Sequence, residues 1–177
     1  MRMFVAVEVP SSVEEASRAL APEHLTLHFL GKIPAERVGS IVAALTPLGA
    51  AVAPFDLTLE GVGAFPSRER PRVVWVGGTE GAAELIRLAA LVRQALAAEG
   101  GSNHDEPFVP HLTLFRVRSA DDRRRAEDLL AGRVPPPTPR RVRVGEFVLK
   151  ESELSSRGAT HRTIATFPLS GIPPDRT

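Results

Sequence analysis

The chain contains no cysteine and no tyrosine, and it has one tryptophan and two methionines among 177 residues. Without cysteine, the chemistry of disulfides, thiolate nucleophiles, iron–sulfur clusters and cysteine-ligated zinc is excluded. With only eight phenylalanines beside the tryptophan, an extended platform for stacking nucleic-acid bases is not expected. No apolar run approaches the roughly 18 residues that a membrane-spanning helix needs. The N-terminal residues also lack the pattern of a secretion signal, so we expect a cytoplasmic protein without a membrane partner.

Length and charge suit one soluble domain, 1–177, whose two ends differ in charge. The chain has 22 Lys or Arg and 21 Asp or Glu, and 20 of the basic residues are arginines. Residues 116–177 carry 13 of the basic residues against 8 acidic ones. Arginine presents a planar fork that matches phosphate, which favours an anionic partner. A general preference for arginine in the source genome gives the same composition and remains an alternative.

Hydrophobic periodicity and turn residues predict an α+β chain in which the helices lie between strands. The expected strands are residues 3–9, 24–30, 52–59, 72–76, 111–117, 142–149 and 161–169. The expected helices are residues 11–20, 34–48, 80–99 and 121–131. Leucine, alanine and valine at helical spacing give the helix at 80–99 one apolar face. The last two strands are expected to pair as a hairpin.

The tetrapeptide His-Leu-Thr-Leu occurs twice, at residues 24–27 and 111–114, and each copy falls in an expected strand. Side chains alternate along a strand, so His24 shares a face with Thr26, and His111 shares a face with Thr113. The leucines then turn to the opposite face and into the core. Each polar face offers an imidazole and a hydroxyl about 6–7 Å apart.

Two such faces brought side by side form a competent set for cleaving a phosphoester. One imidazole removes a proton from the attacking oxygen, and the other protonates the leaving oxygen, because histidine titrates near neutral pH. The two threonine hydroxyls hold the non-bridging phosphate oxygens. This chemistry requires neither a metal ion nor a cofactor.

Other interpretations of the histidines stay open. A single histidine on a strand is usually a hydrogen-bonded or surface residue. His24 and His28 have the spacing of two zinc ligands on a helix, but on a strand they lie about 13 Å apart. A non-catalytic module that binds a 2′-phosphate would use the same face, although binding alone does not need two titrating groups. A scaffold domain leaves the repeated polar face unexplained.

The two motifs and their neighbours resemble the 2H phosphoesterase superfamily, and within it the RNA 2′,3′-cyclic phosphodiesterases, historically called 2′-5′ RNA ligases. The matching segments are residues 2–7, 24–31, 73–77, 108–116, 147–149, 152–154 and 166–169. The resemblance implies two pseudo-symmetric lobes, each an antiparallel sheet flanked by helices, around a central cleft (the LigT-like fold). It implies hydrolysis of a terminal 2′,3′-cyclic phosphate to a 2′-phosphate, with reversible 2′-5′ ligation as a second reaction.

Carried over residue by residue, the resemblance makes His24 and His111 the catalytic pair and Thr26 and Thr113 the phosphate-binding residues. In the family, the second histidine is expected to be the base and the first the acid, although this sequence does not distinguish the two. The implied partners are RNA ends or small cyclic nucleotides. Because one chain carries both motifs, a monomer is the simplest expectation.

Four further features bear on the substrate. Phe115 shares the expected face of His111 and is a candidate for stacking on a base. Arg116 stands where the family often has arginine, but on an ideal strand it faces away from His111, so contact with substrate needs a bulge. His161 replaces a common tyrosine and is interpreted as a packing residue first. The segment before His24 is shorter than is usual in the family.

Overall fold

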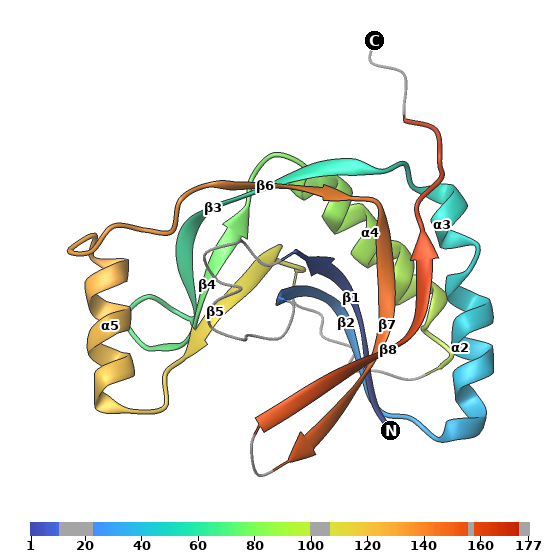
Figure 1. The fold of residues 1–177 in the computed structure, drawn as a ribbon, viewed down its shortest axis with the longest axis horizontal. Coiled ribbons are helices and arrows are strands. Elements are labelled where there is room, and N and C mark those ends of the chain that lie inside the picture. Colours follow the sequence, from blue (N-terminus) through green and yellow to red (C-terminus); the bar gives the residue numbers. More distant parts are fainter. Residues whose placement is uncertain (11–22, 100–106, 156–157, 174–177) are drawn as a thin grey trace.

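The computed structural model describes residues 1–10, 23–99, 107–155 and 158–173 (Figure 1). Its strands are β1 (Arg2–Val9), β2 (Glu23–Lys32), β3 (Phe55–Pro66), β4 (Pro71–Gly78), β5 (His111–Arg116), β6 (Arg140–Val144), β7 (Glu146–Ser155) and β8 (Gly158–Pro168). Its helices are the 3-10 turn η1 (Ala35–Arg37), α2 (Val38–Leu45), α3 (Leu48–Ala51), α4 (Ala82–Ala95) and α5 (Ala120–Leu130). None of the helices in these ranges combines the length and hydropathy that a membrane crossing requires.

The strands form two four-stranded antiparallel sheets, which confirms the expected α+β class. The first sheet has the order β2-β1-β7-β8, and the second has the order β5-β4-β3-β6. The motif strands β2 and β5 are therefore edge strands of different sheets, and they contact each other where the sheets meet. Figure 1 shows this junction near the middle of the molecule, with α5 beyond the second sheet and α2 and α3 beside the first.

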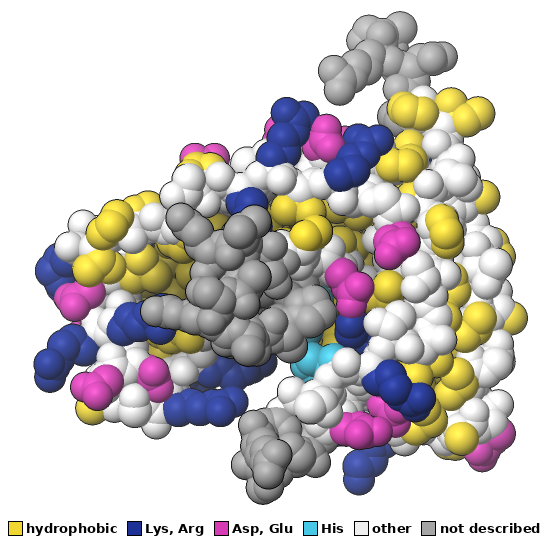
Figure 2. All heavy atoms as spheres, viewed as in Figure 1, with side chains coloured by type: hydrophobic (Ala, Val, Ile, Leu, Met, Phe, Trp, Pro, Cys, Tyr) yellow, Lys and Arg dark blue, Asp and Glu magenta, His cyan; other side chains and the backbone are white. Residues whose placement is uncertain are grey.

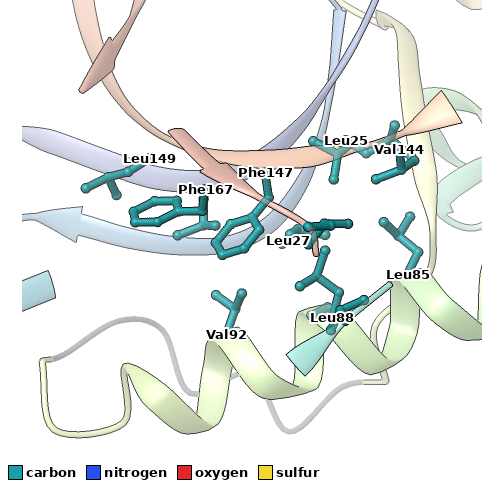
Figure 3. Packing of buried hydrophobic residues seen from close by; sticks show 14 of the residues in the cluster. Leu25, Leu27, Leu85, Leu88, Val92, Val144, Phe147, Leu149 and Phe167 are labelled. Atoms are coloured by element: carbon teal, nitrogen blue, oxygen red, sulfur yellow. The ribbon is translucent and has the colours of Figure 1, made fainter. Parts of the chain in front are cut away.

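One hydrophobic core joins the two sheets to α4. The apolar face predicted for this helix is buried, with Leu85, Leu88 and Val92 all inaccessible to solvent. Figure 3 shows Leu85 and Leu88 on the side of Leu25 and Leu27 of β2, whereas Val92 points toward Phe147. Each fully buried aliphatic side chain contributes about 1.5–3 kcal/mol to folding, so the leucines of the first motif hold β2 firmly against α4. The other face of β2 is thereby turned away from the core.

Two expected strands differ from those in the structure. The single strand expected at 142–149 is wrong, because the chain passes from one sheet to the other at Gly145. Strand β6 pairs with β3 in the second sheet, whereas β7 pairs with β1 and β8 in the first. The pairing of β7 with β8 confirms the expected final hairpin. The expected loop after residue 59 is largely strand, since β3 continues through Gly61, at φ +79°, to Pro66.

The helices also differ in detail. The single helix expected at 34–48 is divided into η1, α2 and α3, and Pro47 stands between the last two. Proline has no N–H to donate and its ring obstructs the preceding turn, which accounts for the interruption. The helix expected at 11–20 lies outside the described residues.

Candidate active site

The first motif shows the alternation that its sequence predicts. Leu25 and Leu27 are buried in the core, whereas His24 and Thr26 are half-buried on the other face of β2. Thr26 lines a pocket that also includes His111, so we call the face of β2 that carries His24 and Thr26, and the face of β5 that carries His111 and Thr113, the cleft face. His24 lies opposite Glu8 of β1 in the register of the sheet. The imidazole and the hydroxyl of the motif therefore share one side of the strand.

The His24 ring is held between two other rings. It lies 5.0 Å, centroid to centroid, from Phe4 of β1 and 5.0 Å from His161 of β8. Phe4 and His161 also meet edge to face at 5.2 Å. The packing expected of His161 thus occurs directly against the catalytic candidate. Burial, with a further effect of the Lys150 charge, lowers the pKa of His161, so this ring is neutral near pH 7.

A buried ion pair lies beside these rings. Lys150 of β7 is 3% exposed and bonds the carboxylate of Glu8, the residue opposite His24. Its ammonium group also donates to the hydroxyl of Thr163 at 3.2 Å. The pair satisfies a charge that would otherwise be costly to bury, and it ties β1 to β7 and β8 behind the first motif.

The second motif places His111 beside two aromatic rings. Its ring meets Phe65 edge to face at 4.9 Å and lies 6.0 Å from Trp75. Its Nδ1 is 2.8 Å from the carbonyl oxygen of Val109. Burial lowers the pKa of His111, the hydrogen bond to Val109 raises it, and the positive charge of Arg116 lowers it further; the net direction is downward. If the Nδ1–H donates to the carbonyl, the neutral ring keeps Nε2 as a proton acceptor.

A bulge at the end of the second motif changes which side chains reach the cleft face. Thr113 lies opposite Trp75 of β4, but Phe115 lies opposite the adjacent residue, Val74. Leu114 is therefore an extra residue in the edge strand, and the alternation of side chains is reversed beyond it. Arg116 returns to the face of Thr113, whereas Phe115 turns to the opposite face.

The prediction that Phe115 shares the face of His111 is therefore wrong. Its ring instead carries the guanidinium of Arg125 from α5, 4.3 Å above the centroid. Arg116 lies on the face of His111, where an ideal strand would not place it, and its positive charge lowers the pKa of His111. The bulge decides both outcomes.

The first motif ends in a bulge of the same kind. Thr26 lies opposite Ala6, but His28 lies opposite the adjacent residue, Val5, so that Leu27 is the extra residue. His28 consequently lies on the core side of β2 and His24 on the cleft face, which removes the zinc spacing as an explanation for the two. No group of three or more His, Cys, Asp or Glu in the described ranges is placed to hold a metal ion.

A pocket of about 770 Å³ joins the two motifs, since its lining includes both Thr26 and His111. Sequence reasoning missed the rings that shape this region. Phe65 lay in a segment expected to be a loop, and Phe4 and Trp75 were expected only as strand residues. Their roles depend on which strands become neighbours, and no local pattern in the sequence signals that.

Comparison with known proteins places the chain among relatives of similar length. Residues 6–154 match the 2′-5′ RNA ligase superfamily. An RNA 2′,3′-cyclic phosphodiesterase from Archaeoglobus fulgidus is 34% identical over 187 aligned residues, covering 94% of this chain and 99% of that protein. An RNA 2′,3′-cyclic phosphodiesterase from Escherichia coli is 33% identical, with 92% of each protein covered.

Solved structures agree with the sequence matches. A crystal structure from Thermus thermophilus has a TM-score of 0.75 and 29% identity, covering 97% of this chain and 99% of that one. The crystal structure of E. coli LigT complexed with 3′-AMP has a TM-score of 0.72 and 26% identity, covering 96% and 98%. The similarity therefore extends over both sheets.

Proposed function

Because this chain belongs to the 2′-5′ RNA ligase superfamily, we propose that it hydrolyses the 2′,3′-cyclic phosphate at an RNA end to a 2′-phosphomonoester. The observation that carries the proposal is that Thr26 and His111, one from each motif, line the same pocket. The family membership confirms the resemblance that the two motifs indicated. The two relatives that align with this chain over nearly their full length are RNA 2′,3′-cyclic phosphodiesterases, which supports the same reaction.

In this proposal His111 is the general base. Its Nδ1–H is engaged by the Val109 carbonyl, so Nε2 is the atom that accepts a proton from water. The lowered pKa keeps the imidazole neutral at pH 7, as a base requires. The water oxygen forms a bond to phosphorus, its proton passes to His111, and the bond from phosphorus to the 3′-oxygen breaks.

His24 then supplies the proton that the departing 3′-oxygen needs, which leaves a 3′-hydroxyl and a 2′-phosphate. The rings of Phe4 and His161 fix the orientation of its imidazole. Thr26 and Thr113 hold the non-bridging oxygens, and Arg116 offsets the charge that develops on them. The 5′-hydroxyl of another RNA can replace water as the nucleophile, and the product is then a 2′-5′ phosphodiester.

The test is hydrolysis of an oligoribonucleotide that ends in a 2′,3′-cyclic phosphate, with EDTA present. We expect the product to carry a 2′-phosphate, and His24→Ala and His111→Ala each to lower kcat by a factor on the order of 10² or more. Phe115→Leu is the matched control, because this ring lies on the opposite face of β5 and should leave kcat unchanged. Thermal denaturation of each variant checks that the fold is retained.

Two results would contradict the proposal. One is turnover that requires a metal ion. The other is no turnover together with tight binding of the 2′-phosphorylated product, which would indicate a binding module instead of an enzyme.

A further inference from the structure

We propose that the pocket beside the catalytic pair is a subsite for the nucleotide that precedes the RNA end. It would hold the 5′-phosphate of the terminal nucleotide and the base before it, so that the protein favours oligonucleotide ends over mononucleotides. This inference rests on the proposed function, and it assigns residues that the two motifs do not include.

The pocket extends to one side of the reacting groups. Its described lining includes Thr26 and His111 but neither His24 nor Thr113, and it reaches as far as Arg93 on α4. A volume of about 770 Å³ lies in the range of sites that enclose a small molecule. The cavity thus adjoins one residue of each motif and extends beyond both motifs to α4.

Two arginines in the pocket lining favour the binding of a second phosphate. Arg72, at the start of β4, and Arg93 are both exposed, and neither forms an ion pair with any other described residue. A nucleoside 2′,3′-cyclic phosphate has a single phosphate, and the proposed function already places it against the histidines and threonines of the two motifs. Arginine prefers phosphate because its fork matches two oxygens. The next phosphate of an RNA end is the 5′-phosphate of the terminal nucleotide.

Phenylalanine rings supply surfaces for a base. Phe29 is 56% exposed and lines the pocket together with Phe65 and Phe108. Phe29 lies beyond the bulge of the first motif and opposite Phe4, whose ring is 6.0 Å away, so it returns to the cleft face. Bases stack on aromatic rings regardless of sequence, which suits a protein that acts on RNA ends.

The surroundings of the pocket favour a longer anion. Figure 2 shows Lys and Arg side chains gathered over the part of this face that belongs to α5 and the nearby ends of β4 and β5. Arg116, at the end of β5, pairs with Val73, and Arg72 directly precedes Val73 at the start of β4. Positive charge therefore lies at this end of β4 and β5, where Arg72 lines the pocket.

The experiment compares three substrates: a nucleoside 2′,3′-cyclic phosphate, the same nucleoside with an added 5′-phosphate, and an oligoribonucleotide with the same terminus. In the wild type, kcat/KM should rise along this series. Arg93→Gln should reduce the gain from the 5′-phosphate on the order of tenfold, through KM more than kcat. Phe29→Ala should reduce the gain from the preceding base on the order of tenfold.

Matched controls lie on the same helix as Arg93. Arg87→Gln removes an exposed arginine outside the pocket lining, and Ile86→Ala removes an exposed apolar side chain outside it. Both should keep the wild-type ratio between the three substrates. A ratio that falls equally in Arg87→Gln and Arg93→Gln would show a general effect of surface charge and would overturn the subsite.

Failure of this inference is distinguishable from failure of the proposed function. If the wild type hydrolyses all three substrates with the same kcat/KM, or if Arg93→Gln weakens all three equally, the subsite is refuted and the catalytic proposal stands. If the wild type hydrolyses none of them, the proposed function is refuted and the subsite with it.

Discussion

Replacing Gly63 with alanine should disturb the active site from behind. Gly63 of β3 lies opposite Trp75 of β4, and the six-membered ring of the indole occupies the space that a Cβ of residue 63 would need. A Cβ at this position would lie 2.7 Å from Cζ3 of the indole and closer still to Cη2 and Cζ2. The glycine is required for this close approach. The indole in turn lies 5.1 Å from Phe65 and 6.0 Å from His111.

The size of the effect follows from that overlap. Carbon atoms in contact prefer about 3.5–4.0 Å, so the indole of Trp75 must move by about 1 Å or more. Overpacking of this kind costs about 1–3 kcal/mol. For a chain of this length that corresponds to a loss of roughly 2–12 °C in Tm. A displacement of about 1 Å in a catalytic group lowers the rate on the order of 10²-fold, and His111 packs against the same rings.

The assay measures Tm, the fluorescence of the single tryptophan and kcat/KM on an RNA with a 2′,3′-cyclic end. Gly39→Ala in α2 is the control, since a Cβ there meets nothing within 4 Å. Its free energy of unfolding should rise by about 0.5–1 kcal/mol, because alanine favours a helix over glycine. In a double-mutant cycle, Trp75→Leu should relieve most of the destabilisation caused by Gly63→Ala. If Gly63→Ala leaves Tm, emission and rate unchanged, the packing argument is refuted.

Two further perturbations test the surroundings of each histidine. Glu8→Gln leaves the buried Lys150 without its carboxylate partner. Because Lys150 is buried and Glu8 is about a third exposed, the free energy of unfolding should fall by about 2–4 kcal/mol, as measured by chemical denaturation. Asp128→Asn, which breaks an exposed pair, should cost less than about 1 kcal/mol, and equal losses would contradict this reasoning. Arg116→Gln removes a positive charge that lowers the pKa of His111, so that pKa should rise. The acid limb of the profile of kcat/KM against pH should then move to higher pH, and an unmoved limb would show that His111 is not the base.

Local sequence was sufficient to predict features that depend only on which face of one strand or helix is buried. The leucines of the first motif are buried and its histidine and threonine are not, because period-two alternation on a half-buried strand leaves no other arrangement. The apolar face of α4 was predictable for the same reason. Recognition of the two motifs, the pairing of β7 with β8 and the helix α5 belong to this class as well.

Features that depend on neighbouring strands were not predictable. The transfer of the chain between sheets at Gly145 depends on which edges are available to β6 and β7. The ring of His161 reaches His24 from β8, at the far side of the same sheet, and it also contacts Phe4 of the intervening strand β1. The faces of Phe115 and His28 depend on register, and a shift of one residue moves every later side chain to the other side.

The two bulges nevertheless follow the repeat, since the extra residue is the last leucine of the tetrapeptide in both cases, Leu27 and Leu114. A bulge bends and twists an edge strand, and it interrupts the row of backbone groups that another edge would pair with. Strands β2 and β5 are edges that contact each other yet belong to separate sheets. We infer that the bulges keep the two edges from joining into one continuous sheet. They would thereby leave the space into which Thr26 and His111 project, so that the fourth residue of each motif serves the site through the backbone as the first and third serve it through their side chains.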